Sequence, residues 1–159
     1  MAALKAFQKA FPEPNTPVSM VFKTMNPKKN NPEYIRFKIK CLADKRVVLL
    51  EKTLDRGEVL GLIQSCDAYV SLHRAEGFGR TIAEALMLGK PAIATDFSGS
   101  KDFVKDNAVS WKPVKLKAKD YPFVMKHDHA WWAEPSITDA ARKMKNLMAR
   151  TLMTTTATQ

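Results

Sequence analysis

The sequence has no long hydrophobic run and little cysteine. No apolar run approaches the roughly 18 to 20 residues that cross a bilayer, and the N-terminus lacks the continuous apolar core of a signal peptide. We therefore expect a cytoplasmic protein. The two cysteines are Cys41 and Cys66, and Cys66 falls in an apolar stretch where a small buried thiol is usual. Neither a disulfide nor a catalytic thiol is expected.

Three motifs of nucleotide and metal sites are also absent. There is no Walker sequence and no Asp-x-Asp pair, and Ile82 stands where the Rossmann dinucleotide fingerprint would need a third glycine after Gly77 and Gly79. These absences argue against a P-loop site and against a dinucleotide site. The His-Asp-His run at 127–129 lies in a polar loop without a third spaced ligand, so we do not expect it to bind a metal.

The composition is that of one folded domain with a basic charge. The 159 residues are 45% hydrophobic and 26% charged, which is enough apolar side chain for one core. A net charge of +10 raises the local concentration of anionic partners such as nucleotide diphosphates, nucleic acid or an anionic bilayer. Because lysine and arginine are spread along the whole chain, the charge alone selects none of these partners.

Helix and strand patterns alternate along the chain. We expect helices at 2–11, 31–43, 55–64, 80–88, 101–104 and 136–150, and strands at 18–25, 47–50, 69–72, 91–95 and 108–111. Asp55 and Glu58 are expected to form a capping box at the start of the helix at 55–64. An irregular lysine-rich loop to about 130 and a disordered, threonine-rich tail at 151–159 complete the chain. The alternation predicts one α/β domain at 1–150, a doubly wound Rossmann-like parallel sheet with helices on both faces. Ligands of such sheets bind beyond the carboxyl ends of the strands.

The candidate site is the segment that joins the strand at 69–72 to the helix at 80–88. Gly77 and Gly79 allow a tight turn and a close approach to a ligand, and the start of the following helix favours a phosphate. Glu84 lies about one turn into that helix, on the side of Arg80 and Thr81, where it can accept hydrogen bonds from a ribose. On spacing alone, a packing turn and an exposed helix glutamate remain the alternative interpretations.

The residues of this segment carry a family resemblance. The run Glu76-Gly-Phe-Gly-Arg-Thr-Ile-Ala-Glu84, followed by Ala85-Leu86 and by Gly-Lys-Pro-Ala-Ile-Ala-Thr at 89–95, resembles the E-x7-E region of retaining glycosyltransferases of family 4. These are the group 1 transferases of the GT-B fold. Ser-Leu-His-Arg at 71–74, Ser-Gly-Ser at 98–100 and Trp-Ala-Glu-Pro at 132–135 fit the same family, so the resemblance covers nearly all of the chain.

The resemblance implies the C-terminal, donor-binding half of a GT-B enzyme, which transfers a hexose from UDP- or GDP-sugar to a glycan, lipid or other acceptor. Glu84 would hold the ribose hydroxyls. Glu76, the catalytic candidate, and the backbone of Gly77, Phe78 and Gly79 would meet the sugar and the diphosphate. Retention in this family is usually ascribed to front-face attack, so we assign Glu76 to donor positioning and not to nucleophilic attack. The resemblance also implies that no metal and no other cofactor is needed.

Other positions extend or restrict the resemblance. Arg80 stands where the family commonly has an aliphatic residue, and it either contacts a phosphate or points to water. His73 corresponds to a family position near the donor, and Lys23, at the end of an early strand, can reach the same strand-end cleft. The N-terminal acceptor domain of the family, together with the first strand and basic loop of the donor domain, is expected to precede Ala2. Catalysis by this chain alone is therefore not expected.

Two alternatives stay open. One is a non-catalytic basic module that binds nucleic acid or an acidic membrane surface through its net charge, with steep salt dependence and no nucleotide selectivity. The other is a GT-B epimerase or phosphorylase, which the Glu-Gly-Phe-Gly segment disfavours. Within the transferase interpretation, nucleic acid is not an expected partner, whereas peripheral contact with the inner face of a membrane is compatible with it. Trp131 and Trp132 are interpreted as packing anchors.

Overall fold

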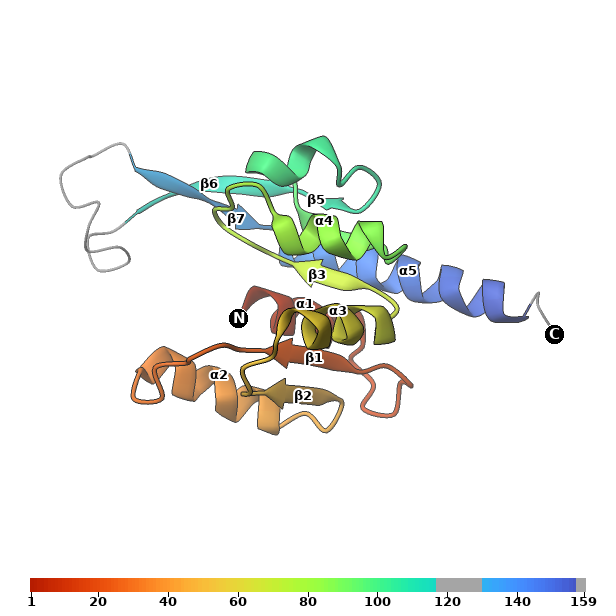
Figure 1. The fold of residues 1–159 in the computed structure, drawn as a ribbon, viewed down its shortest axis with the longest axis horizontal. Helices are drawn as coiled ribbons and strands as arrows, with labels where there is room; N and C mark the ends of the chain where they lie inside the picture. Colours follow the sequence, from red (N-terminus) through yellow and green to blue (C-terminus); the bar gives the residue numbers. More distant parts are fainter. Residues whose placement is uncertain (117–129, 157–159) are drawn as a thin grey trace.

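The computed structural model describes residues 1–116 and 130–156 of the chain (Figure 1). Its helices are α1 (Ala2–Ala10), α2 (Pro32–Leu42), α3 (Arg56–Ser65), α4 (Arg80–Met87) and α5 (Ile137–Thr156), with a 3₁₀ turn η1 (Ser98–Asp102). Its strands are β1 (Met20–Lys23), β2 (Val47–Leu50), β3 (Tyr69–Ser71), β4 (Ala92–Thr95), β5 (Ala108–Val109), β6 (Trp111–Lys115) and β7 (Trp131–Pro135). The expected alternation of helices and strands is confirmed up to β5.

The strands form two parallel groups and one antiparallel hairpin. β1 pairs with β2, and β3, β4 and β5 pair in that order, all in parallel. β6 and β7 pair antiparallel, from Trp111 opposite Pro135 to Lys115 opposite Trp131. Helices lie on both sides of the parallel strands, with α3 and α4 in front of them and α1 and α5 behind in the view of Figure 1. The expected Rossmann-like α/β architecture is confirmed.

Two apolar clusters lie on opposite faces of β4. One joins α1 and α5 to the strands, and its buried residues are Ala6, Phe7, Ala10, Phe11, Ile93, Val109, Ala140, Ala141 and Met144. The other joins α4 to the strands, and its buried residues are Ile82, Ala92, Ala94 and Val104. Because side chains alternate between the faces of a strand, Ile93 enters the first cluster and its neighbours Ala92 and Ala94 enter the second. All four residues of β4 are buried as a result.

Arg46 fastens the end of α1 to the start of β2. Its guanidinium lies 2.8 Å from a carboxylate oxygen of Asp44, donates to the carbonyls of Phe11 and Glu13 at 2.9 Å each, and sits 5.1 Å from the ring centre of Phe7. The hydrogen bonds from Arg46 lower the pKa of Asp44 to about 2. The ionised carboxylate therefore stabilises the folded chain.

Local signals at the helix starts agree with the structure. The side chain of Asn31 accepts from the N–H of Glu33 at 2.8 Å at the start of α2. At the start of α3, Asp55 accepts from the N–H of Glu58 at 2.8 Å and Glu58 accepts from the N–H of Asp55 at 3.0 Å, which confirms the expected capping box. At α5, Ser136 accepts from the N–H of Asp139 at 3.2 Å.

The C-terminal third corrects several expectations. The last helix was not expected to be preceded by a strand, but Trp131–Pro135 form β7, paired with a longer β6. The short helix expected at 101–104 is η1, which begins at Ser98. α5 continues past its expected end at Arg150 to Thr156, so the first part of the threonine-rich tail is helical. The His-Asp-His run at 127–129 lies outside the described residues.

Candidate functional site

A turn of two glycines connects β3 to α4 at the carboxyl edge of the parallel strands. Gly79 has φ 83° and ψ 46°, a left-handed backbone conformation that residues other than glycine rarely adopt. A Cβ at Gly79 would also meet the Cδ1 of Ile82 at 3.1 Å. Gly77, by contrast, has no atom within 4 Å of the position of an added Cβ. The turn is therefore open to solvent at Gly77, whereas the left-handed backbone of Gly79 determines its direction.

The start of α4 differs from the starts of α2, α3 and α5, because no side chain caps it. Gly79 is the N-cap residue, and the first turn of the helix holds no acidic residue. The first N–H groups of a helix have no acceptor within the helix and carry a partial positive charge. Within the described residues, the glycine turn therefore presents uncapped N–H groups that suit an anion.

A second loop, at 98–100, closes against the glycine turn. The N–H of Gly99 donates to the carbonyl of Gly77 at 3.2 Å. A Cβ at Gly99 would lie 2.2 Å from that carbonyl oxygen and 2.8 Å from the Cα of Phe78, so only glycine fits. Phe78 is 64% exposed, and its ring centre lies 5.7 Å from that of Phe103. The sequence did not indicate that position 99 requires glycine. The requirement arises only because the loop at 98–100 approaches the backbone of Gly77 and Phe78.

His73 joins the ends of β3 and β4. Its Nε2 lies 3.1 Å from the carbonyl of Phe97 and its Nδ1 lies 3.2 Å from the hydroxyl of Ser71. Because a carbonyl can only accept, Nε2 donates to Phe97. Thr95 also donates to the backbone carbonyl of His73 at 2.7 Å. Nε2 and the backbone carbonyl of His73 thus join the two strand ends, whereas Nδ1 contacts a residue of its own segment.

Both glutamates of the E-x7-E region have partners within the protein. Glu76 accepts from the N–H of Gly79 at 3.2 Å, which folds the glycine turn back on itself. Glu84, in α4, lies 3.2 Å from the guanidinium of Arg56 at the start of α3. The side chain of Glu84 is 17% exposed and that of Arg56 is 71% exposed. An ion pair with so exposed a partner is weak, so a ligand can displace Arg56 at little cost.

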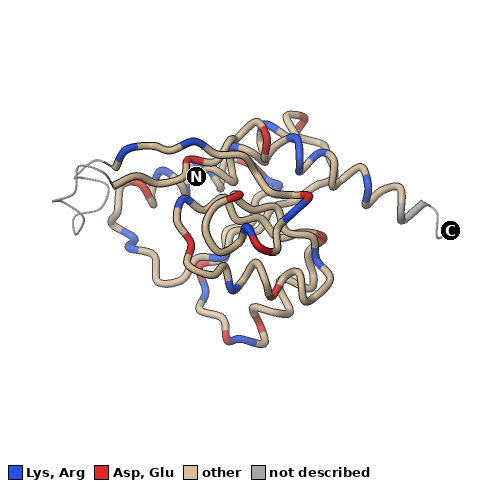
Figure 2. Tube along the Cα trace, turned by 90° about the horizontal axis from the view of Figure 1, so that it is seen from above, with Lys and Arg blue, Asp and Glu red and all other residues tan. Residues whose placement is uncertain are grey.

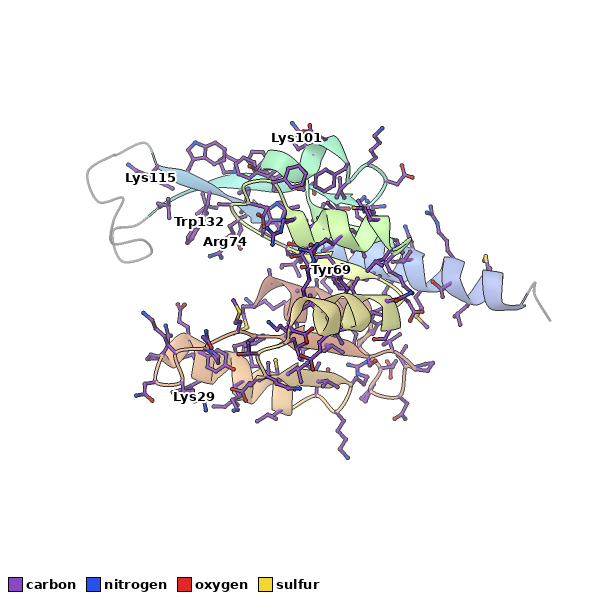
Figure 3. All side chains as sticks on the ribbon, viewed as in Figure 1. Lys29, Tyr69, Arg74, Lys101, Lys115 and Trp132 are labelled. Carbon is purple, nitrogen blue, oxygen red and sulfur yellow. The ribbon has the colours of Figure 1, made fainter. Side chains whose placement is uncertain are left out.

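Tyr69, the first residue of β3, packs against the apolar cluster of α4 (Figure 3). Burial raises the pKa of its phenol, the negative charges of Glu76 and Glu84 raise the pKa further, and a hydrogen bond with Thr81 lowers it. Tyr69 was not among the expected site residues. Tyr69 and Ser71 lie on the same face of β3, and Tyr69 packs against the cluster of α4. This periodicity alone does not distinguish Tyr69 from other strand residues as a site residue.

The β6–β7 hairpin is attached to the end of β3 through Arg74. The Nε of Arg74 lies 2.6 Å from a carboxylate oxygen of Glu134, and its guanidinium lies 4.4 Å from the ring centre of Trp132 (Figure 3). The N–H of Ala133 donates to the carbonyl of Arg74 at 3.0 Å. The Trp-Ala-Glu-Pro segment therefore holds the strand end that precedes the glycine turn.

Aromatic rings cover the neighbouring end of β4. Trp111 and Trp131 stack with centroids 5.6 Å apart and planes 8° apart, and Phe97 lies 4.9 Å from Trp111. The indole N–H of Trp111 donates to the carbonyl of Asp96 at 2.5 Å. Trp131 and Trp132 thus contact protein side chains, and Trp131 remains 46% exposed.

The expected site residues are brought together with one exception. Glu76 accepts from the turn at 77–79, His73 bonds to the start of the loop that closes on it, Thr81 and Glu84 lie in α4 directly after it, and Arg80 is exposed at the first position of α4. Lys23 ends β1 in the other parallel group, and no described contact of the glycine turn involves it.

A shallow hollow lies away from the glycine turn. It measures about 430 Å³ and is lined by Ser110, Trp111, Lys112, Glu134, Pro135, Ser136 and Ile137. Since it contains none of the uncapped N–H groups, we place the candidate site at the turn and not in this hollow. No three metal-ligating side chains gather among residues 1–116 and 130–156, and none of the helices described there is long and apolar enough to span a bilayer. The independence of metal remains a prediction.

Among the described residues, lysine and arginine are spread along the trace, with aspartate and glutamate between them (Figure 2). Several of the basic side chains form ion pairs, including Lys38 with Glu51 and Arg142 with Asp139. A nucleic-acid interface would be expected to gather such residues on one face or groove.

The comparisons with known proteins agree with the geometry of the turn. The chain matches the protein family described as "Glycosyl transferases group 1" over residues 4–150. No curated protein and no solved structure matches it. Because the family match covers both parallel groups, the glycine turn and most of α5, the chain belongs to the group 1 glycosyltransferases.

Proposed function

We propose that this chain binds the nucleotide-sugar donor of a retaining, metal-independent GT-B glycosyltransferase, with the diphosphate of UDP- or GDP-sugar on the glycine turn. The observation that carries the proposal is the uncapped start of α4 behind a turn open at Gly77. Helices α2, α3 and α5 begin with side-chain caps, whereas α1 and α4 do not, and of these two α4 begins behind the glycine turn and leaves its first N–H groups for a ligand. An oxyanion at this point gains hydrogen bonds and a favourable helix dipole.

The two glutamates are given different tasks in this proposal. When the donor binds, the carboxylate of Glu84 releases Arg56 and accepts hydrogen bonds from the two ribose hydroxyls, since a carboxylate can accept two hydrogen bonds from a diol. Glu76 keeps the turn in shape through the N–H of Gly79 and positions the hexose, which makes it the catalytic candidate. Developing charge on the leaving diphosphate is stabilised by the N–H groups of α4, and Arg80 is placed to add a cation.

The remaining residues support or border the donor. Phe78 and Thr81 line the turn, and His73 fixes its distance from the loop at 98–100. Lys23 contributes to the cleft only if the donor extends from the glycine turn to the end of β1. The acceptor, a glycan, a lipid or another molecule, is held by an acceptor domain outside these residues, so the isolated chain binds a donor without transferring its sugar. A cytoplasmic location, at the inner face of a membrane for a lipid acceptor, belongs to the same proposal.

Calorimetric titration with UDP, GDP and their sugars tests this function. Glu84→Gln is expected to weaken binding of the nucleoside diphosphate by about 1 to 3 kcal/mol, the range of charge-assisted hydrogen bonds. Glu76→Gln should leave that affinity almost unchanged and reduce only the additional affinity for the correct nucleotide sugar. Arg56→Gln is the matched control, because it removes the partner of Glu84 without removing the carboxylate.

All three variants must first melt like the parent. Unchanged binding of the diphosphate by Glu84→Gln would contradict the ribose role, and robust transfer by the isolated chain would contradict the need for an acceptor domain. Binding that depends steeply on salt without selectivity for a nucleotide would instead favour the basic-module alternative.

A further inference from the structure

α2 exposes a row of large aliphatic side chains to solvent. Ile35 is 44% exposed, Ile39 is 61% exposed and Leu42 is 69% exposed. Positions four and seven residues apart lie on one face of a helix, so the three side chains form a continuous row along α2. We refer to these three residues as the α2 stripe.

The α2 stripe is not the face by which the helix packs on the sheet. The ring of Phe37 packs edge-on against that of Phe22 in β1, with centres 5.1 Å apart, and Cys41 is buried. By helical spacing, Phe37 and Cys41 lie on a face that is turned well away from the stripe. α2 is therefore apolar on two faces, and the described fold buries only one of them.

The other helices differ from α2 in this respect. Among the described residues, α1 and α3 expose no large hydrophobic side chain, and α4 exposes only Met87. In α5, Leu152 and Met153 are exposed near the end of the helix. Single exposed hydrophobic residues are normal on a protein surface, whereas a contiguous exposed row indicates a surface that binds something.

Basic side chains surround the α2 stripe. By helical spacing Arg36 and Lys40 lie along one flank of it, and within the described residues neither of them forms an ion pair. The helix itself contains one acidic residue, Glu33. Lys29 lies near α2 in Figure 3. The exposed basic residues in and around the helix are Lys28, Lys29, Arg36, Lys40 and Lys45.

We propose that the α2 stripe and the basic residues around it form a docking surface for an anionic lipid bilayer, with α2 lying in the plane of the interface. Helices that bind this way place apolar side chains at the boundary of the acyl chains and use lysine and arginine to attract anionic head groups. The long side chains of Arg36 and Lys40 can extend to the head groups while their stems lie beside the stripe.

Other occupants match this surface less well. A second copy of the chain would bring two basic surfaces together, which like-charge repulsion opposes. A nucleic acid would use the cations but would gain nothing from three aliphatic side chains, because its backbone is recognised through phosphate contacts. Only an anionic bilayer uses the apolar and the basic parts of the surface together.

The position of α2 bears on the donor site. α2 packs beside β2, and the two form the lower border of the molecule in Figure 1. The glycine turn follows β3, in the other parallel group and in the upper half of the same view. A bilayer against the α2 stripe would therefore leave the glycine turn open to a donor. Only this consequence rests on the proposed function, since the docking surface itself follows from α2.

Flotation of the full chain with lipid vesicles tests the surface. We expect binding to vesicles of equimolar phosphatidylcholine and phosphatidylglycerol, and binding about tenfold weaker or less to phosphatidylcholine alone, which lacks the anionic head groups. Ile35→Gln, Ile39→Gln and Leu42→Gln together should weaken binding to the anionic vesicles by about tenfold or more, because the stripe then buries little apolar area. Arg36→Gln with Lys40→Gln should weaken it by about twentyfold, at about fivefold for each charge.

Matched controls change the same kinds of side chain elsewhere on the surface. Met87→Gln removes an exposed apolar side chain from α4, and Lys101→Gln with Lys105→Gln removes two exposed charges. Lys101 lies at the opposite border of the molecule from Lys29 in Figure 3. Both controls should bind within about twofold of the parent, because charges beyond a Debye length from the bilayer are screened. All variants should melt like the parent, since the replaced side chains are exposed.

Several results would overturn the proposal. These are equal binding to both kinds of vesicle, unchanged binding by the stripe variant, and an equal loss in the Lys101 and Lys105 control, which would reduce the effect to net charge. A parent that sediments as a dimer without lipid, and becomes a monomer in the stripe variant, would assign the stripe to a second copy. Binding of duplex RNA in place of vesicles would assign the cations to nucleic acid. UDP affinity is measured on the same variants, so vesicle binding without UDP binding counts against the proposed function alone.

Discussion

Because the loop at 98–100 lies close to the glycine turn, even a methyl side chain at position 99 should destabilise the fold strongly. Gly99→Ala would place a Cβ 2.2 Å from the carbonyl oxygen of Gly77 and 2.8 Å from the Cα of Phe78. Both obstacles belong to the backbone, so no side-chain rotation relieves the clash. The two loops must separate, and the hydrogen bond from the N–H of Gly99 to Gly77 is lost with them.

The cost follows from these two terms. Overpacking typically costs about 1 to 3 kcal/mol, and a lost hydrogen bond adds about 1 kcal/mol. We therefore expect Gly99→Ala to lower the free energy of unfolding by about 2 to 4 kcal/mol. At about 2 to 4 °C per kcal/mol for a chain of this size, the melting temperature should fall by about 4 to 16 °C. Urea denaturation and thermal melting measure both quantities.

Gly77→Ala is the matched control, in the same pair of loops. Its Cβ would meet no atom within 4 Å, and Gly77 is not among the residues with positive φ. The substitution should leave stability unchanged or raise it slightly, because alanine restricts the unfolded chain. If the diphosphate approaches Gly77 closely, Gly77→Ala will weaken UDP or GDP binding without loss of stability. Equal melting of Gly99→Ala and the parent would refute the close approach of the loops.

Three other expectations can be checked in the same assays. Asp44→Asn should cost at most about 2 kcal/mol at pH 7, because Arg46 lowers the pKa of this carboxyl to about 2. The contribution is present above the unfolded pKa near 4 and is lost as the pH falls toward 2, so urea titrations should show parent and variant converging in acid. A double-mutant cycle of Arg74→Ala and Glu134→Gln should give a coupling of about 0.5 to 1 kcal/mol, and zero coupling would mean that this partly exposed pair does not hold the hairpin. A chelator should leave UDP and GDP affinities unchanged, and a metal requirement would contradict the proposed chemistry.

Features set by neighbouring residues could be predicted from the sequence. The capping box of Asp55 and Glu58 and the turn of Gly77 and Gly79 depend on residues within one helical turn, and both are found where they were expected. The alternation of apolar strands with amphipathic helices was enough to predict the α/β architecture, because each element shows its periodicity alone.

Features that depend on distant residues could not be predicted. β7 contains Glu134 and ends at Pro135, so it lacks the alternation of a strand and is recognisable only by its pairing with β6. Likewise, Gly99 is required because another loop approaches it, and Arg56 reaches Glu84 only because α3 packs beside α4.

The aromatic cluster gives this protein an intrinsic optical probe. All three tryptophans lie in β6 and β7, and Trp111 stacks on Trp131 with planes only 8° apart. Two indoles in such contact couple their electronic transitions, so the pair should give a paired positive and negative band in circular dichroism. The fluorescence of the chain likewise comes from this hairpin, since tryptophan dominates protein emission. A change of signal upon ligand binding would therefore report movement of the hairpin at the carboxyl edge, with no label attached.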